Sequence, residues 1–267
     1  MSDARNSIKV MTFNICGVIL DGPNGWPNRA TLNVRTVKRY DADLIGFQEV
    51  GAGILRTYQA ELPEYDYVKG PKYLNHEPYL YPSIFWKQSR FQLIDSGGFW
   101  LSRTPDRHSG DWGTKYVRSV TWANLQDRQT GLVVSHWNTH LDNESDAARV
   151  EGAGLMLQRI EEIGNGGAMV VLTADFNSAP GSLVYQTLME GGFVDTFLAA
   201  GNEDSETAST IHRYEGEAYA GLRIDWILTL DRAQMVQAKS CIIARDHDHP
   251  LYPSDHYPVI AELDILG

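Results

Sequence analysis

Six polar groups stand where predicted buried strands end or begin, and their residue types suit metal binding and acid–base chemistry. They are Asn14, Glu49, His140, Asp175 with Asn177, Asp225, and Asp255 with His256. Carboxylate and amide oxygens are ligands for hard cations such as Mg²⁺, and carboxylates and imidazoles exchange protons with reacting groups. A buried strand that delivers such groups is a costly way to fill a core, because buried polar groups need partners. The pattern therefore predicts a chemical site at the rim of a sheet.

Residues 169–178 carry this pattern most clearly. An apolar run rich in β-branched residues, entered through two glycines, is typical of a buried strand. Asp175 and Asn177 stand two residues apart and therefore on one face of the strand. Residues 178–181 then favour a turn. This strand end can hold a metal, position a water molecule, or do both.

The elements that must position these groups are more often strands than helices. Hydrophobic patterning predicts strands at 8–15, 42–50, 83–87, 91–94, 117–125, 132–138, 169–174, 224–230, 236–243 and 258–263. Helices are predicted at 29–40, 52–62, 145–164 and 182–190. Hairpins mix with strand–helix units in this order, which favours two packed sheets with helices outside over a plain parallel sheet. We expect one α/β domain over residues 1–267.

Composition limits the classes of partner. The 34 acidic and 23 basic residues give a formal net charge of −11, which opposes a polyanion and weighs against an enzyme of duplex DNA. No apolar run reaches membrane-spanning length, and the start of the chain lacks a signal-peptide pattern, so we expect a cytoplasmic protein. Cys16 and Cys241 are too few for a disulfide framework. A monomer is favoured.

Six short segments resemble, in their order along the chain, the motifs of the endonuclease/exonuclease/phosphatase superfamily of Mg²⁺-dependent phosphoesterases. They are residues 12–14, 47–50, 138–140, 174–177, 224–225 and 254–256. The resemblance is closest to small bacterial members and the deadenylase-like branch. It implies a DNase I-like four-layer α/β sandwich, in which two mixed, mostly antiparallel sheets pack face to face with helices outside. The site is then expected where the two sheets meet at the rim.

The resemblance also implies a metal centre. Glu49 is the expected principal ligand of Mg²⁺, or of Mn²⁺ in its place, since a hard cation prefers carboxylate oxygen. Asn14 is expected beside that metal, as a ligand or as the holder of a water molecule. Asp255 is expected to ligate a metal or to assist the leaving group. The sequence does not decide between one metal ion and two.

The remaining roles that the resemblance implies are catalytic. Asp175 with Asn177 is expected to orient and deprotonate the attacking water. His140 and His256 are expected to contact the non-bridging phosphate oxygens, with Asp225 fixing the tautomer of His256.

One position departs from the DNase-like pattern. Those members carry a glutamate that orients the histidine matching His140, whereas Leu80 stands near that place here. Glu77 lies three residues earlier and is not assigned a catalytic role.

Substrate binding is predicted from one loop. Residues 103–118 contain four basic and two acidic side chains, and Arg118 at the start of a strand is the best single candidate to bind phosphate. We expect a Mg²⁺-dependent phosphodiesterase or phosphatase that acts on a small or single-stranded ester by in-line attack of water. Two alternatives stay open: a nuclease of DNA or RNA, and a phosphoester-binding module whose catalytic site has decayed.

Overall fold

The computed structural model describes residues 7–18, 22–71, 80–163 and 169–266. Their strands form two six-stranded sheets. The first sheet has, in spatial order, β11 (Val236–Ile243), β12 (Val259–Ile265), β1 (Ser7–Asn14), β2 (Leu44–Val50), β4 (Tyr81–Lys87) and β3 (Tyr65–Val68). The second has β5 (Phe91–Trp100), β6 (Ser119–Asp127), β7 (Val133–His140), β8 (Met169–Asp175), β10 (Asp225–Leu230) and β9 (Val194–Asp195).

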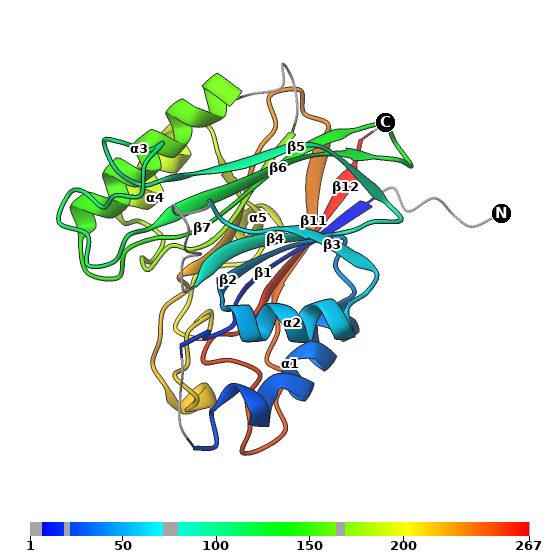
Figure 1. The fold of residues 1–267 in the computed structure, drawn as a ribbon. Helices are drawn as coiled ribbons and strands as arrows, with labels where there is room; N and C mark the ends of the chain where they lie inside the picture. The colour runs from blue at the N-terminus through cyan, green and yellow to red at the C-terminus, as the bar shows by residue number, and fades with distance from the viewer. Residues whose placement is uncertain (1–6, 19–21, 72–79, 164–168, 267) are drawn as a thin grey trace.

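Helices cover the outer face of each sheet (Figure 1). Helices α1 (Trp26–Tyr40) and α2 (Ala52–Glu61) pack on the first sheet, and α3 (Asp146–Ile163) and α4 (Leu183–Glu190) pack on the second. A short α5 (Thr196–Ala199) and a 3₁₀ turn, η1 (Gly216–Ala218), precede β10. The four-layer sandwich predicted from the sequence is therefore confirmed.

Alternation along each strand builds three apolar layers. In β1, Ile8 and Val10 face the second sheet and belong to the central core, whereas Met11 and Phe13 pack beneath α1 and α2. Val134 of β7 fills the same central layer from the other side. Polar side chains enter this inter-sheet layer toward the rim, as the strand ends predicted, and the buried Arg90 joins Asp43 and Asp127 at the opposite end.

Three local details differ from the sequence prediction. Helix α1 begins at Trp26 rather than at residue 29, because Pro27 is tolerated in the first turn of a helix. Strand β5 extends through Gly97, where an added Cβ would lie 2.7 Å from the Trp122 ring. Strands β3 and β9 were not predicted, because they have four and two residues, too few for a clear hydrophobic period.

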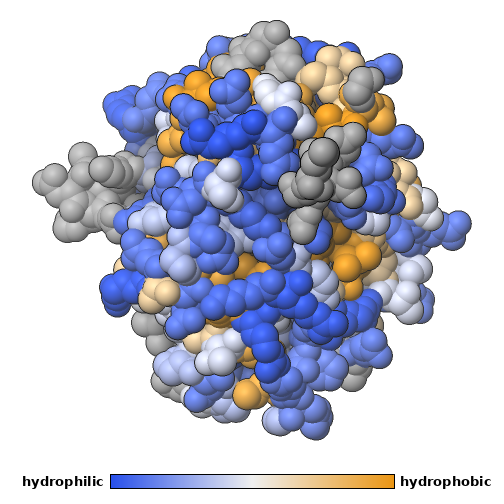
Figure 2. All heavy atoms as spheres, turned by 90° about the vertical axis from the view of Figure 1, so that its right-hand side faces the viewer, coloured by the Kyte–Doolittle hydropathy of each residue, from blue (hydrophilic) through white to orange (hydrophobic). Residues whose placement is uncertain are grey.

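The far end of the sandwich, where β1 starts and β12 ends, differs from the rim. Figure 2 shows this end as a mainly hydrophilic surface with scattered hydrophobic patches. A hollow of about 600 Å³ there is lined by side chains of both charges, among them Lys9, Asp43, Lys239, Glu262 and Asp264. Every helix in the described part of the chain is too short or too polar to span a bilayer.

Candidate active site

Strand direction brings the predicted polar residues to one edge of the sandwich. Strands β1 and β2 run parallel, as do β7 and β8, so Asn14 lies beside Gln48 and His140 beside Asp175. Strand β10 runs antiparallel to β8 and therefore begins where β8 ends, which pairs Asp225 with Asp175. We call Asn14, Glu49, His140, Asp175, Asp225 and His256 the polar cluster.

Glu49 reaches the polar cluster through a bulge in β2. The pairing of β2 with β4 shifts by one residue between Phe47 and Val50, and Glu49 adopts a left-handed φ of 66°. Its Oε2 accepts a hydrogen bond from the Gly17 amide at 2.9 Å. A Cβ on Gly17 would lie 1.7 Å from the carbonyl oxygen of Glu49, so only glycine fits there. The strained backbone turns the Glu49 carboxylate toward the second sheet.

Asn14 links carboxylates from both sheets. Its Nδ2 donates to Asp175 Oδ2 at 2.9 Å and lies 3.4 Å from Glu49 Oε1. Its Oδ1 accepts from the Cys16 amide at 3.0 Å. The side chain therefore presents N–H groups, not its oxygen, to the centre of the cluster.

Asn177 supports the same carboxylate from the turn after β8. Its backbone N–H donates to Asp175 Oδ1 at 2.9 Å, the local bond typical of an Asp side chain at a turn. Its Nδ2 donates to the Leu141 carbonyl at 3.0 Å, just after β7. Asn177 thus fixes Asp175 relative to the end of β7.

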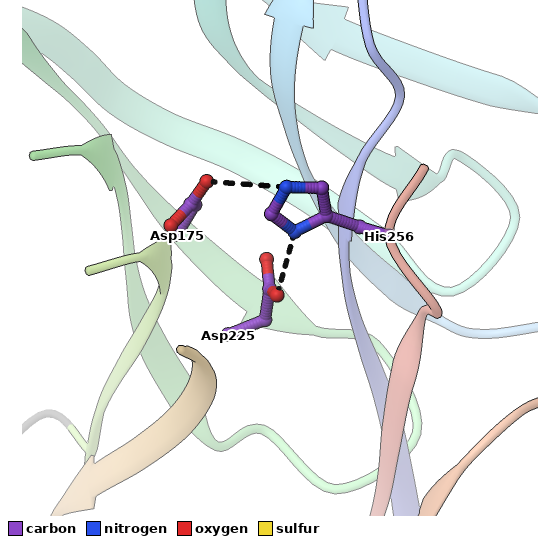
Figure 3. A group of neighbouring side chains, drawn as sticks. All are labelled: Asp175, Asp225 and His256. Carbon is purple, nitrogen blue, oxygen red and sulfur yellow. Dashed lines mark hydrogen bonds and ion pairs between the residues drawn. The ribbon is translucent and has the colours of Figure 1, made fainter. Parts of the chain in front are cut away.

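His256 and Asp225 form a buried pair beside Asp175 (Figure 3). His256 Nδ1 lies 2.8 Å from Asp225 Oδ2, and His256 Nε2 lies 3.8 Å from Asp175 Oδ2. The other oxygen of Asp225 is buried and has no hydrogen-bond partner among the described residues. The pair therefore orients the imidazole with Nε2 toward Asp175.

The electrostatic environment shifts the pKa values of the two histidines in opposite directions. Burial opposes the imidazolium form of His256, but the carboxylates of Asp225, Asp175 and Asp255 outweigh burial and hold its pKa well above the usual value. Burial, aided by the positive charges of Arg118 and His256, holds the pKa of His140 well below the usual value. His256 is thus a cation at neutral pH, and His140 is neutral.

Asp175 is the most perturbed carboxyl group of the cluster. Burial and the nearby charge of Asp225 raise its pKa to about 7, although His256 and the hydrogen bonds from Asn14 and Asn177 oppose that rise. His140 Nε2 lies 3.3 Å from Asp175 Oδ2. A carboxyl group with a pKa near neutrality is suited to exchange protons at physiological pH.

Two predicted site residues lie apart from these contacts. The Asp255 carboxylate accepts from Ser254 Oγ at 3.2 Å and makes no ion pair within the described part of the chain. Arg118 lies with its guanidinium 5.3 Å from the centre of the Tyr116 ring, and its Nε is buried without a partner. Burial lowers the pKa of Arg118, while the charges of Asp175 and Glu49 oppose that shift.

Sequence reasoning missed two buried residues that hold the loops of the site. Asp142, two residues after His140, accepts hydrogen bonds from Thr114 Oγ1 and from the amides of residues 115, 116, 144 and 145. Arg29 of α1 donates to the carbonyl oxygens of Ile15, Cys16 and Pro253. The short spacing from His140 is a signal for Asp142; nothing in the sequence near Arg29 indicates its contacts. Glu77 lies outside the described residues.

The donor set fits a divalent metal ion. The side chains of Glu49, Asp175, Asp225 and Asp255 bring more negative charge than His256 and Arg118 offset. The unpartnered oxygen of Asp225 shows that this charge is not fully compensated by hydrogen bonds. Oxygen donors of this kind suit a hard cation.

Comparison with known proteins agrees with this geometry. Residues 11–256 match the profile of the Endonuclease/Exonuclease/phosphatase family. An endonuclease/exonuclease/phosphatase from Bacteroides vulgatus is 29% identical, with a TM-score of 0.86 over 97% of this chain and 99% of that one. A mannosyl-6-phosphatase from Bacteroides thetaiotaomicron is 26% identical, with a TM-score of 0.86 over 96% of this chain and 99% of that one.

More distant structures share the fold alone. The human Nocturnin catalytic domain with bound sulfate is 20% identical, with a TM-score of 0.76 over 98% of this chain and 96% of that one. A search of curated proteins gives no match. Since the family profile spans nearly the whole chain and includes the polar cluster, this protein belongs to the endonuclease/exonuclease/phosphatase family and is a phosphoric ester hydrolase.

Proposed function

We propose that the protein is a Mg²⁺-dependent phosphoesterase that hydrolyses a small phosphoester by in-line attack of water. One observation supports the proposal above the others: Asp175 lies between a protonated imidazole and the carboxylate of Glu49. Its Oδ2 is 3.8 Å from His256 Nε2 and accepts from Asn14, which also reaches Glu49. A base, a cationic donor and a ligand for a metal ion therefore surround one position.

Glu49 is the residue best placed to hold the cation. Its side chain is 17% exposed and its Oε1 faces Asn14 and His140. Asp175, Asp225 and His256 also have potential ligand atoms within 4.8 Å of one another. The positive charge on His256 in that group disfavours a second cation there, so we assign the metal to Glu49, with Asn14 beside it. Mg²⁺, when bound, supplies charge that polarises a phosphoryl oxygen.

Asp175 is the proposed base for the attacking water. The Asn177 amide holds one carboxylate oxygen and Asn14 holds the other, so the carboxyl group has a fixed orientation. Its raised pKa increases its affinity for the proton that water loses on attack. Asn177 acts here through its backbone and through its bond to the Leu141 carbonyl.

The phosphate oxygens are the proposed partners of the cationic groups. His256, oriented by Asp225, donates from Nε2 to a non-bridging oxygen as negative charge develops there. His140 is neutral and donates to a second oxygen without adding charge. Arg118 supplies a further positive charge from the rim. Asp255, beside His256 in the chain, is proposed to ligate a metal or to assist the leaving group.

The charges around the rim favour a substrate with a single phosphate group. Arg103 pairs with Asp111, and Lys115 pairs with Glu144, so carboxylates engage two of the four basic side chains of residues 103–118. Arg118 makes no ion pair within the described residues and its buried Nε has no partner, so we assign it to bind phosphate. The similarity to a mannosyl-6-phosphatase further favours the monoester of a small alcohol over a polynucleotide.

The proposed function is tested with p-nitrophenyl phosphate, bis-p-nitrophenyl phosphate and a single-stranded oligonucleotide, each with Mg²⁺, Mn²⁺ or EDTA. Hydrolysis of the small esters is expected to require the metal and to stop in EDTA. Because the substrate carries little charge, KM is expected to change weakly with salt, in contrast to the steep dependence of polyanion binding. Faster cleavage of the oligonucleotide with a steep salt dependence would favour a nuclease. Absence of turnover with all three would favour a decayed phosphoester-binding module.

Asp142 is predicted to control substrate affinity through the loop that carries Arg118. Its Oδ2 accepts from Thr114 Oγ1 and from the amides of Lys115 and Tyr116, at 2.8, 2.9 and 3.2 Å. Burial opposes the ionised form of Asp142, but the hydrogen bonds from the Ser145 amide, Thr114 Oγ1 and the amides of residues 144 and 116 outweigh burial and lower its pKa to about 2. In Asp142→Asn, the side-chain oxygen can keep the bonds from the amides of residues 144 and 145, and an NH₂ group then replaces Oδ2. This NH₂ group cannot accept the hydrogen bonds from residues 114, 115 and 116. The loop is then expected to detach from the end of β7.

The expected result of Asp142→Asn is a rise in KM of about tenfold or more, because misplacing a binding group by about 1 Å weakens productive contacts. Steady-state kinetics measure KM and kcat, and calorimetry measures metal affinity, which is expected to stay unchanged. Thr114→Val removes one of the three donors and is expected to give a smaller rise. Equal KM values in wild type and Asp142→Asn, with a lower unfolding temperature, would limit Asp142 to a structural role.

A further inference from the structure

A second layer of polar side chains lies in the inter-sheet core directly beneath the polar cluster. It contains Thr12, Gln48, Asn138 and Thr173, each fully buried. Three of them stand two residues before a member of the cluster on the same strand, and Gln48 directly precedes Glu49. We call these four residues the support layer. None of them has a place in the proposed reaction, yet buried polar groups are retained at a cost unless they are bonded.

Asn138 is the centre of the support layer and binds the first sheet from the second. Its Nδ2 donates to the carbonyl oxygens of Phe47 in β2 and Ser83 in β4, at 2.8 and 2.9 Å. Phe47 and Ser83 are the last regular pair before the bulge that contains Glu49. The side-chain amide of β7 therefore binds both strands where the bulge begins.

The acceptor side of Asn138 is held equally firmly. Its Oδ1 accepts from Gln48 Nε2 at 2.8 Å and lies 3.2 Å from Thr173 Oγ1. Gln48 Nε2 also lies 3.0 Å from Thr12 Oγ1. Strands β1, β2, β7 and β8, which carry Asn14, Glu49, His140 and Asp175, are thus joined by one hydrogen-bonded network.

The close approach that this network needs is built into β2. A Cβ on Gly46 would lie 1.9 Å from Thr173 Oγ1 and 2.9 Å from Asn138 Oδ1. Only glycine therefore lets β2 come near enough to β7 and β8 for these bonds. Strands β2 and β7 are in contact along the core, as are β2 and β8.

We propose that Asn138 is a positioning residue for Glu49, and the proposal rests on the function proposed above. By binding the carbonyl oxygens of Phe47 and Ser83, its amide fixes the bulge and the left-handed backbone of Glu49. By accepting from Gln48 of β2, it sets the distance between the two sheets, while its contact with Thr173 holds β7 beside β8. The separation of Glu49 from His140, 3.8 Å between Oε1 and Nδ1, then follows from the support layer.

The test compares Asn138→Leu with Asn124→Leu. Asn124 of β6 is also buried, and its Oδ1 accepts from Ser135 Oγ at 2.7 Å within the second sheet. Both variants lose a buried hydrogen bond and are expected to unfold at lower temperature. In Asn138→Leu alone, amide exchange at residues 47–51 is expected to speed up in the metal-free protein. Mg²⁺ affinity and kcat are expected to fall roughly 10- to 100-fold, the usual effect of removing a group that orients a ligand.

Thr173→Val keeps the side-chain shape and provides the test if Asn138→Leu does not fold. It is expected to change exchange at residues 47–51 and Mg²⁺ affinity in the same direction by a smaller factor. Unchanged exchange and unchanged Mg²⁺ affinity in the variants that fold would overturn the inference. The exchange measurement needs neither metal nor substrate. A wild type without metal-dependent activity would therefore contradict the proposed function, and amide exchange at residues 47–51 would still decide whether Asn138 positions Glu49.

Discussion

Glu49→Ala is expected to lower metal-dependent turnover by about a thousandfold, since a bound cation contributes several kcal/mol of charge stabilisation in the transition state. The Glu49 carboxylate lies at the β2 bulge, 3.4 Å from Asn14 Nδ2 and 3.8 Å from His140 Nδ1. No other carboxylate of the described polar cluster combines partial exposure with distance from the His256 cation. The measurements are kcat at saturating Mg²⁺ and the Mg²⁺ dissociation constant, with the fold monitored by circular dichroism.

Two further variants separate charge from structure. Glu49→Gln keeps an acceptor for the Gly17 amide and removes the negative charge, so it is expected to lose metal affinity while keeping the unfolding temperature. Glu61→Ala removes an exposed glutamate of α2, whose carboxylate lies 3.5 Å from Lys38, and is expected to behave as wild type. Equal kcat values for Glu49→Ala and Glu61→Ala would show that Glu49 holds no essential metal.

The position of the site was predictable because it depends on strand order and on where strands end. Parallel neighbours end at the same edge of a sheet, which aligns Asn14 with Gln48 and His140 with Asp175, and the packing of the two sheets then brings these pairs together. The alternation of apolar side chains gave those strands, since one face of each must be buried. Sequence motifs and strand geometry therefore carry independent information about the same edge.

The geometry of Glu49 was not predictable from its neighbours in the sequence. Its φ of 66° requires a bulge against β4, a loop glycine at position 17, and the Asn138 amide from another sheet. Each partner is distant in sequence, and a local sequence pattern does not predict such contacts. Hydrophobic periodicity predicts which face a residue takes, but it does not predict a left-handed backbone.

The binding loop shows the same limit for charge. A count of charges over residues 103–118 suggested a positive surface, yet Lys115 pairs with Glu144 and Asp106 pairs with Arg159, both outside the counted residues. Glu144 lies on a different segment, so its neutralising effect enters only through the tertiary fold. Arg118 remains the proposed phosphate-binding residue, because its Nε is buried and has no hydrogen-bond partner within the described residues.

Asp175→Asn is expected to lower kcat by a factor on the order of 10³ to 10⁴, because it removes the proposed general base. The raised pKa of Asp175 also predicts the pH profile of the wild type. Activity requires the carboxylate form, so it is expected to fall as the pH falls through the pKa of Asp175, about 7 in the metal-free protein. A bound cation favours the carboxylate and moves this acid limb to lower pH.

The same variant distinguishes a lost base from a damaged fold. Burial and Asp225 raise the pKa of Asp175, so the ionised group costs stability above the pKa that it has in the unfolded chain. Removing that charge relieves the repulsion, and the unfolding temperature of Asp175→Asn at pH 8 is expected to hold or rise. Residual activity in the variant is expected to lack the acid limb. An active Asp175→Asn with an unchanged pH profile would assign the proton transfer to another group, since a carboxamide does not act as a base at these pH values.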